Sequence, residues 1–158
     1  MDSQFTPPMS AAYREAVGKF AERICVDPAH LLQSHPIDYE GVRFRFDHHG
    51  HIDPQGLLVV VEVGTVEPGS EAVVLRHLLE RHVLTPAAVC GYYGMVPGTQ
   101  VILYFVRLDL SAQADCADAI AALITSVTYG LKELMDELKR DIDQALNPAA
   151  AHPSTVNV

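Results

Sequence analysis

Two long apolar runs dominate the middle of the chain and predict strands that are covered on both faces. The first is LLVVVEV, from Leu57 to Val63, and the second is VILYFV, from Val101 to Val106. A half-exposed strand alternates apolar and polar residues, because its successive side chains point to opposite faces of the sheet. Here both faces of each strand are apolar. A domain of this size has few helices with which to cover both, so a second copy or a client chain is expected to bind.

Helical periodicity predicts three helices around these strands. The first is capped by Ser10 and ends at Asp27-Pro28, and the second begins after Ser70 and ends before Pro86. The third is long and begins at Ser111. Each carries apolar residues at the spacing of one helix face.

The remaining strands follow from alternation and turn residues. Val42 to Phe46 alternates apolar and charged residues, which predicts a half-exposed strand. Pro97-Gly98 predicts the turn of a hairpin that leads into the run at Val101. The predicted fold is therefore α+β, with an antiparallel twisted sheet flanked by three helices in the order helix, strands, helix, two strands, long helix. Within the 158 residues, a single domain is expected over residues 10–145, with a loose lead-in at 1–9 and a flexible tail at 146–158.

The second helix has an unusually broad apolar arc. Projected at about 100° per residue, its apolar residues cover about half of the circumference, which is wider than the stripe of an ordinary surface helix. The helix is either deeply set on its own sheet, or meets the sheet with one edge and a twin helix with the other. His82 projects into this arc. It is either a neutral histidine of the core, or a group of an interface in which its protonation at about pH 6 would place a charge. The apolar arc consists of Val74, Leu75, Leu78, Leu79 and Val83.

Composition narrows the classes of partner. The formal net charge is -9 and 49% of the residues are hydrophobic, which suits a folded protein and argues against nucleic acid or an anionic membrane as partner. No apolar run approaches the roughly 20 residues of a membrane-spanning helix, and the first residues do not read as a signal peptide. Three cysteines without CxxC spacing favour free thiols in a reducing cytoplasm.

No arrangement of residues predicts an enzyme or a cofactor site. The glycines of GYYGMVPG lie between two strands and lack a lysine, which disfavours nucleotide binding. His48, His49 and His51, flanked by Asp47 and Asp53, have side chains that could bind a divalent metal. A polar turn between strands is the favoured interpretation of this cluster, because it lacks the two-element geometry of a structural zinc site. No catalytic residue, cofactor or metal is therefore expected.

The order of elements resembles a known family. The segments LLVVVEVGTVEPGSEAVVLRHLLERHVL and GYYGMVPGTQVILYFVRLDLSAQ, in a small acidic chain, resemble the class I type III secretion chaperones, the Tir-chaperone (CesT-like) family. The resemblance extends from about Tyr13 to Leu138. The family normally has three strands before the second helix, whereas only two are predicted here, at Val42 to Phe46 and Leu57 to Val63.

The resemblance implies a function. Members of the family are homodimers in the bacterial cytoplasm that bind the N-terminal segment of a secreted effector in extended form, keep it soluble and deliver it to the export apparatus. The secretion ATPase is a further partner that such a chaperone could meet. The family dimerises through the second helix, which implies an interface at Val74, Leu75, Leu78, Leu79 and His82. Client contacts are implied for Tyr13, Val17, Phe20, Ile24, Val42, Phe44 and Phe46, all of which could equally be core residues.

Two alternatives stay open. The first is a regulatory or sensory protein of the same fold that has no secretion client. The second is a small metal-binding protein that uses the turn from His48 to His51.

Overall fold

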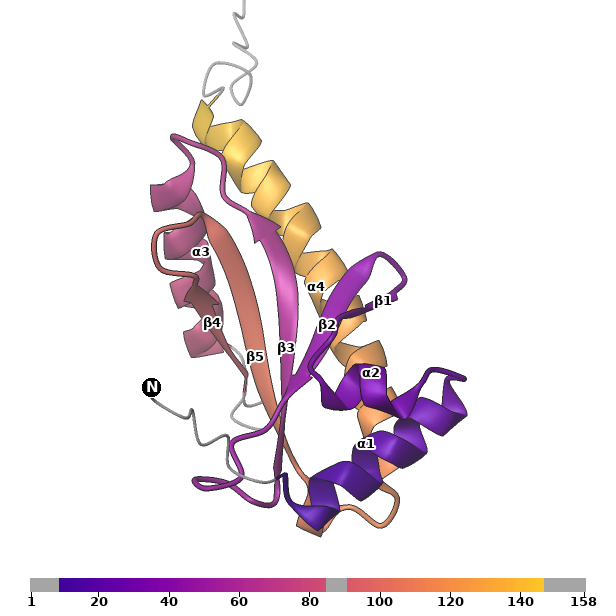
Figure 1. Ribbon diagram of the computed structural model, residues 1–158. Helices are drawn as coiled ribbons and strands as arrows, with labels where there is room; N and C mark the ends of the chain where they lie inside the picture. Colours follow the sequence, from indigo (N-terminus) through magenta and orange to yellow (C-terminus); the bar gives the residue numbers. More distant parts are fainter. Residues whose placement is uncertain (1–8, 85–90, 147–158) are drawn as a thin grey trace, which may run out of the picture.

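The computed structural model describes residues 9–84 and 91–146, and in these ranges five strands form one antiparallel sheet in the order β1-β2-β3-β5-β4 (Figure 1). The strands are β1 (Ile37–Tyr39), β2 (Val42–Asp47), β3 (Gly56–Thr65), β4 (Gly91–Met95) and β5 (Val101–Asp109). The helices are α1 (Ala11–Arg23), α2 (Pro28–Leu32), α3 (Glu71–Leu84) and α4 (Cys116–Leu146), with a short 3₁₀ turn, η1 (Leu110–Ala112). The predicted α+β class and element order are confirmed. Nearly all of the predicted lead-in and tail lie outside the described residues.

The first strand of the sheet is one that the sequence did not reveal. β1 has three residues and pairs with β2 through Tyr39↔Val42 at its end. Glu40 and Gly41, both at positive φ (50° and 81°), make the tight turn between the two strands. Three residues are too few for alternation to be recognised. The structure therefore has three strands before α3, as the resemblance implied, and not the two predicted from the pattern.

Local capping sets where the helices begin. The Ser10 hydroxyl accepts the N–H of Tyr13 at 3.1 Å, so the predicted cap of α1 is confirmed. The predicted start of the last helix at Ser111 is wrong. Asp109 accepts the N–H of Ser111 and turns the chain into η1. The Asp115 carboxylate then accepts the N–H of Asp118 at 3.0 Å, and α4 begins at Cys116.

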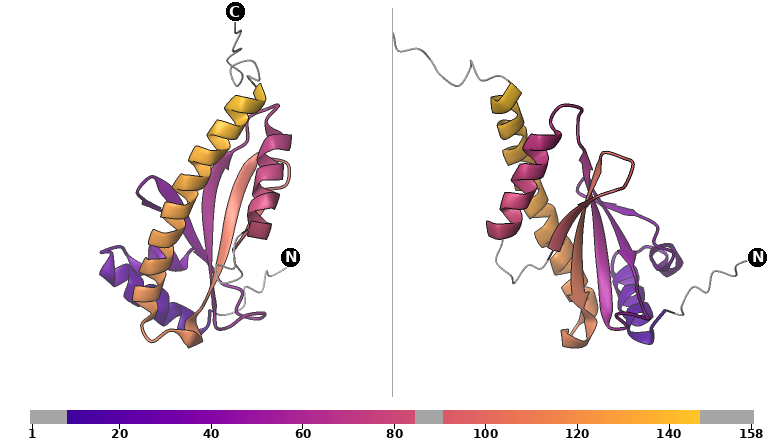
Figure 2. Two further views of the ribbon diagram at one scale, coloured as in Figure 1. Left: turned by 180° about the vertical axis from the view of Figure 1, so that it is seen from behind. Right: turned by 90° about the vertical axis from the view of Figure 1, so that its left-hand side faces the viewer.

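The helices α3 and α4 lie on one face of the sheet (Figure 2), and α1 packs into the same core beside β2. That face carries Phe44 and Phe46 of β2, which are fully buried, and the Phe46 ring meets Phe20 of α1 edge to face at 5.6 Å. α4 crosses the same face and contributes Ile120 and Leu134, also fully buried. The core thus lies between the sheet and a layer of helices, and the domain has two layers.

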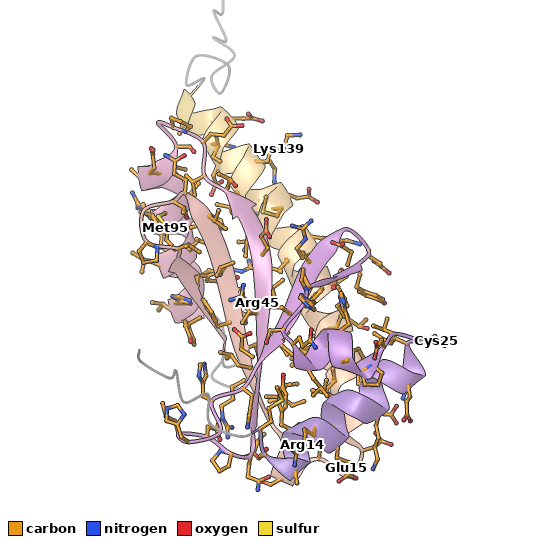
Figure 3. The ribbon with its side chains drawn as sticks, in the orientation of Figure 1. Arg14, Glu15, Cys25, Arg45, Met95 and Lys139 are labelled. Atoms are coloured by element: carbon orange, nitrogen blue, oxygen red, sulfur yellow. The ribbon has the colours of Figure 1, made fainter. Side chains whose placement is uncertain are left out.

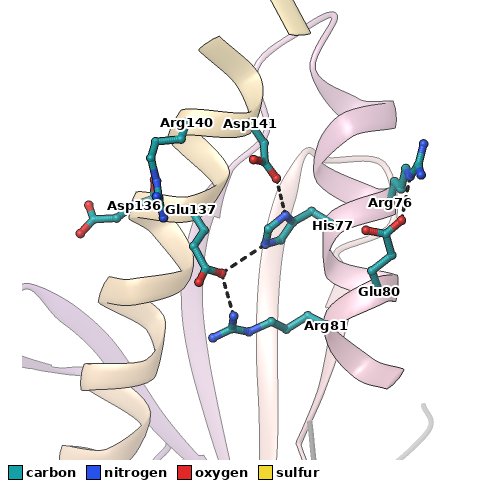
Figure 4. Close-up of polar contacts among 8 residues, drawn as sticks. All are labelled: Arg76, His77, Glu80, Arg81, Asp136, Glu137, Arg140 and Asp141. Atoms are coloured by element: carbon teal, nitrogen blue, oxygen red, sulfur yellow. Dashed lines mark hydrogen bonds and ion pairs between the residues drawn. The ribbon is translucent and has the colours of Figure 1, made fainter. Parts of the chain in front are cut away.

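Polar contacts join α3 to the last turns of α4 (Figure 4). The ring of His77 lies 2.7 Å from the Asp141 carboxylate, and Arg81 donates to Glu137 at 2.7 Å. Charged contacts of this kind on a partly exposed surface add little stability and mainly fix orientation. Apolar packing of Val74 and Leu78, which are buried, holds α3 on the core.

The two faces of the sheet should differ in their contribution to stability. We expect Phe46→Ala to lower the free energy of unfolding by about 3–5 kcal/mol, because it leaves a cavity in the core. Phe105→Ala should cost less than about 2 kcal/mol, since Phe105 lies half-buried on the other face. Urea denaturation of both variants measures this difference, and equal losses would contradict the two-layer description.

Candidate functional site

The face of the sheet that points away from the helices is apolar and is covered by none of the described helices (Figures 1 and 2). A row of paired residues crosses it, from Arg45 on β2 through Val60 and Phe105 to Tyr92 on β4. The rings of Tyr92 and Phe105 stack at 4.9 Å, and Tyr92 is 54% exposed. We call this surface the open face; its accessible apolar residues are Leu58, Tyr92, Val101, Leu103 and Phe105, whereas Val60 between them is only 2% exposed.

A glycine on the edge strand shapes the open face. Gly94 is paired with Leu103, next to the stacked rings. A Cβ at Gly94 would lie 3.2 Å from Cε2 of Phe105, so the ring rests against bare backbone. The Phe105 ring therefore packs against both the Tyr92 ring and the backbone of Gly94.

Charged residues surround the open face. Arg45, labelled in Figure 3, lies on β2 at one side of this face and pairs with Asp47 at 3.4 Å. Arg107 donates two hydrogen bonds to Asp53, at 2.5 and 2.9 Å, and these bonds lower the pKa of the Asp53 carboxyl. Because Asp53 belongs to the loop before β3, the ion pair holds that loop against β5 beside the open face.

A second apolar surface lies on α3. The exposed fractions of Leu75, Leu79 and Val83 are 41%, 66% and 85%, and they rise toward the C-terminal end of the helix. With Ala72 these residues lie on one side of α3, at helical spacing. We call them the α3 stripe. Three large exposed apolar side chains in a row on one helix are unusual for the surface of a monomer.

Some of the residues predicted for a dimer interface are exposed, and others are buried in the core. Leu75 and Leu79 belong to the α3 stripe, whereas Val74 and Leu78 are 6% and 4% exposed and pack in the core. The broad arc therefore has one edge on the sheet, and its other edge is uncovered in the described chain. A substitution at Leu78 would disturb folding before it could report on association.

His82 connects α3 to the edge of the sheet. Its Nε2 accepts the backbone N–H of Tyr93 at 2.9 Å, and the two rings pack at 5.1 Å. This bond requires a free lone pair on Nε2, so His82 is neutral in the observed arrangement. Burial, together with nearby Tyr104, raises the pKa of Tyr93 to about 12. The interaction also occupies one backbone donor of the edge strand β4.

Most residues predicted to contact a client lie in the core. Tyr13, Val17 and Phe20 of α1 are at most 2% exposed, and so are Phe44 and Phe46 of β2. Burial, and to a lesser degree Asp47, raises the pKa of Tyr13. In the same predicted set, Ile24 is 37% exposed and Val42 is half-buried. The five core residues could reach a client only if the helices moved away from the sheet.

The histidine cluster joins elements of the fold. Nε2 of His48 accepts the N–H of Ser10 at 3.1 Å, so its Nδ1–H donates to the Gly56 carbonyl at 3.2 Å. The same ring stacks on Tyr13 at 4.4 Å. His49 and His51 are exposed. Among the residues that the structure describes, no three His, Cys, Asp or Glu side chains gather in a group that could hold a metal.

Comparison with known proteins bears on the fold. No protein-family model and no curated protein matches the sequence. Among solved structures, a chain of the HopA1–SchA chaperone–effector complex superposes with a TM-score of 0.53 over 82% of this chain and 94% of that chain, at 10% sequence identity. At this identity the likeness shows a shared fold. Within the described ranges, no helix is long and apolar enough to cross a membrane.

The ion pair beside the open face predicts a pH-dependent contribution to stability. Because the folded-state pKa of Asp53 is lowered, its contribution is present above the unfolded value of about 4 and is lost as the pH falls below it. Asp53→Asn should lower the free energy of unfolding at neutral pH by less than about 1 kcal/mol, since the pair is partly exposed. Denaturation curves should show that the free energies of unfolding of the variant and the parent protein become equal as the pH is lowered below about 4. A difference that does not change with pH would contradict this assignment.

Proposed function

We propose that this chain is a class I type III secretion chaperone of the Tir-chaperone (CesT-like) kind. As a homodimer in the bacterial cytoplasm, it binds the N-terminal segment of a secreted effector in extended form, keeps it soluble and delivers it to the export apparatus. The observation that carries the proposal is the open face, an apolar sheet surface with no helix of the described chain over it. The fold shared with a chain of a chaperone–effector complex supports the same proposal.

The open face has the chemistry that an extended apolar segment needs. Leu103 and Phe105 provide apolar contacts at its centre, and Tyr92 adds a phenol at one side. Charged residues such as Arg45 and Arg107 surround this centre and keep the unbound protein soluble. The client contacts are therefore proposed here and not at the buried residues of α1 and β2. Ile24 and Val42 stay in the proposed contact set because they are partly accessible.

The two edges of the sheet have different roles in this proposal. At the β4 edge, the backbone N–H of Tyr93 already donates to His82 of α3. The same helix carries the exposed α3 stripe. Met95 is also exposed there (Figure 3). We assign this side of the molecule to the second copy. The β1 edge then stays free for backbone pairing with an extended client.

Dimerisation through the α3 stripe makes a paired prediction. Leu79→Asp should leave the fold intact and raise the dimer dissociation constant by about a hundredfold, because a carboxylate in an apolar interface is left without a partner. Leu78→Asp should instead unfold the chain, since Leu78 is in the core. Light scattering gives the mass and circular dichroism the fold. A folded dimer of unchanged stability in the Leu79 variant would contradict the proposed interface.

Client binding through the open face makes a second prediction. The tagged chain, recovered from the cytosol of its native host, should retain one or two large proteins bound through their N-terminal segments. Phe105→Asp should remain a folded dimer and lose at least about tenfold in affinity for that client, because charge replaces a central apolar contact. The matched control is Tyr129→Asp, at an exposed position of α4 on the opposite side of the molecule.

The outcomes separate the alternatives. Equal loss in the Phe105 and Tyr129 variants would contradict the assignment to the open face. A stable dimer that retains no client under conditions that induce secretion would favour the regulatory or sensory function of the same fold.

A further inference from the structure

An apolar groove lies on the helical side of the molecule, away from the open face. It has a volume of about 480 Å³ and is bounded by α3, the C-terminal half of α4 and the end of β3. Apolar side chains from all three elements line it, including Val63, Val74, Leu78, Met135, Leu138 and Ile142. A second hollow of about 450 Å³, beside the β1–β2 turn, shares Val63, Met135 and Asp136 with it. We call the first hollow the α3–α4 groove.

The end of β3, which borders the groove, is irregular. The pairing of β3 with β5 shifts between Glu62 and Gly64, and Gly64 has a φ of +151°, which favours glycine. The nearest atom to a Cβ built on Gly64 would be Cε of Met135, at 4.0 Å. The backbone is therefore bare on the side that faces α4. Met135 is 44% exposed, so the groove is open to solvent beside it.

The charges around the α3–α4 groove are mostly negative. Glu67, Asp136 and Asp143 contribute carboxylates and Lys139, in the upper part of α4 (Figure 3), contributes one ammonium group. None of these four side chains has an ion-pair partner among the described residues. In Figure 4 the Asp136 carboxylate points away from α3, whereas Glu137 and Asp141 of the same helix are engaged by α3.

This combination of features limits what the groove can bind. A volume of this size falls within the range of ligand pockets, roughly 300–1,000 Å³. The carboxylates disfavour nucleic acid and anionic lipid, and the apolar floor disfavours a simple cation. A second copy of this chain would bring further negative charge to an acidic rim, because its net charge is -9. The complementary occupant has apolar side chains flanked by positive charge.

We propose that the α3–α4 groove binds a basic amphipathic segment of a partner protein. The apolar side chains of that segment enter the groove beside Met135, where it is open to solvent, and its Lys and Arg side chains face Glu67, Asp136 and Asp143. The site is separate from the open face and does not depend on the proposed client contacts. A chain with both surfaces can hold an extended client on the sheet while a second protein segment occupies the helical side.

A model peptide tests this proposal with the full chain. The probe is a fluorescein-labelled synthetic helix of Leu and Lys, and its comparison is a peptide with the same Leu pattern and Glu in place of Lys. Fluorescence polarisation at about 0.15 M salt, where long-range attraction is screened, should give one site per chain. The Leu–Glu peptide should bind at least about tenfold more weakly.

Matched variants localise the site. Asp136→Lys should weaken binding of the Leu–Lys peptide by about tenfold, whereas Glu22→Lys, the same charge change at an exposed position of α1, should have less than about a threefold effect. Met135→Ser should also weaken binding, and Tyr129→Ser, at an exposed position of the same helix, should not. Both positions on α4 are accessible, so these variants are expected to fold.

Three results would overturn the proposal. Equal effects of the two lysine variants would mean attraction by net charge alone, and equal affinity for the two peptides would mean an apolar site without charge selection. A lower mass of the free Asp136→Lys protein in light scattering would assign the groove to a second copy of the chain.

Discussion

The structure depends on one constraint: all of the described helices that pack on the sheet cover the same face. Phe46, Val59 and Val106 on that face are 3% exposed or less, and α1, α3 and α4 complete the core around them. β3 and β5 are nevertheless apolar on their other face as well. Apolar surface that stays in contact with water costs free energy, about 25 cal/mol for each Å². A client laid across that face would remove the cost, which connects the arrangement of layers to the proposed function.

The helix α3 is likewise covered by the rest of the described chain on only one side. One side of this helix supplies Val74 and Leu78 to the core, and the adjacent side presents Leu75, Leu79 and Val83 to solvent. His82 and Arg81 fix the helix against β4 and α4, so the exposed side is held in one orientation. An apolar stripe held rigidly in this way needs little ordering when a partner binds, which favours association. In the proposed dimer, this side of the molecule and the open face therefore serve different partners.

Much of this organisation could be predicted from the sequence, because it follows from periodicity. Two-sided apolar runs predicted a sheet with a surface left to cover, and the broad arc of the second helix predicted either a helix set deeply on its sheet or one with contacts on two sides. Periodicity cannot distinguish a core residue from a contact residue on the same stripe, and Tyr13, Val17 and Phe20 proved to be buried. The open-face residues Leu103 and Phe105 stood in the predicted apolar run but were not selected as client contacts. The role of His48 depends on Ser10, 38 positions away, and this long-range contact leaves no local pattern.

The central claim concerns which face of the sheet meets a client, and side-chain footprinting tests it most directly. The chain would be labelled with hydroxyl radicals, alone and in complex with the protein that co-purifies from its native host, and analysed by mass spectrometry. The account predicts that Tyr92 and Phe105 lose labelling in the complex while Tyr129, on the exposed side of α4, keeps it. Unchanged labelling of Tyr92 and Phe105 with a client bound, together with protection of Tyr129, would contradict it.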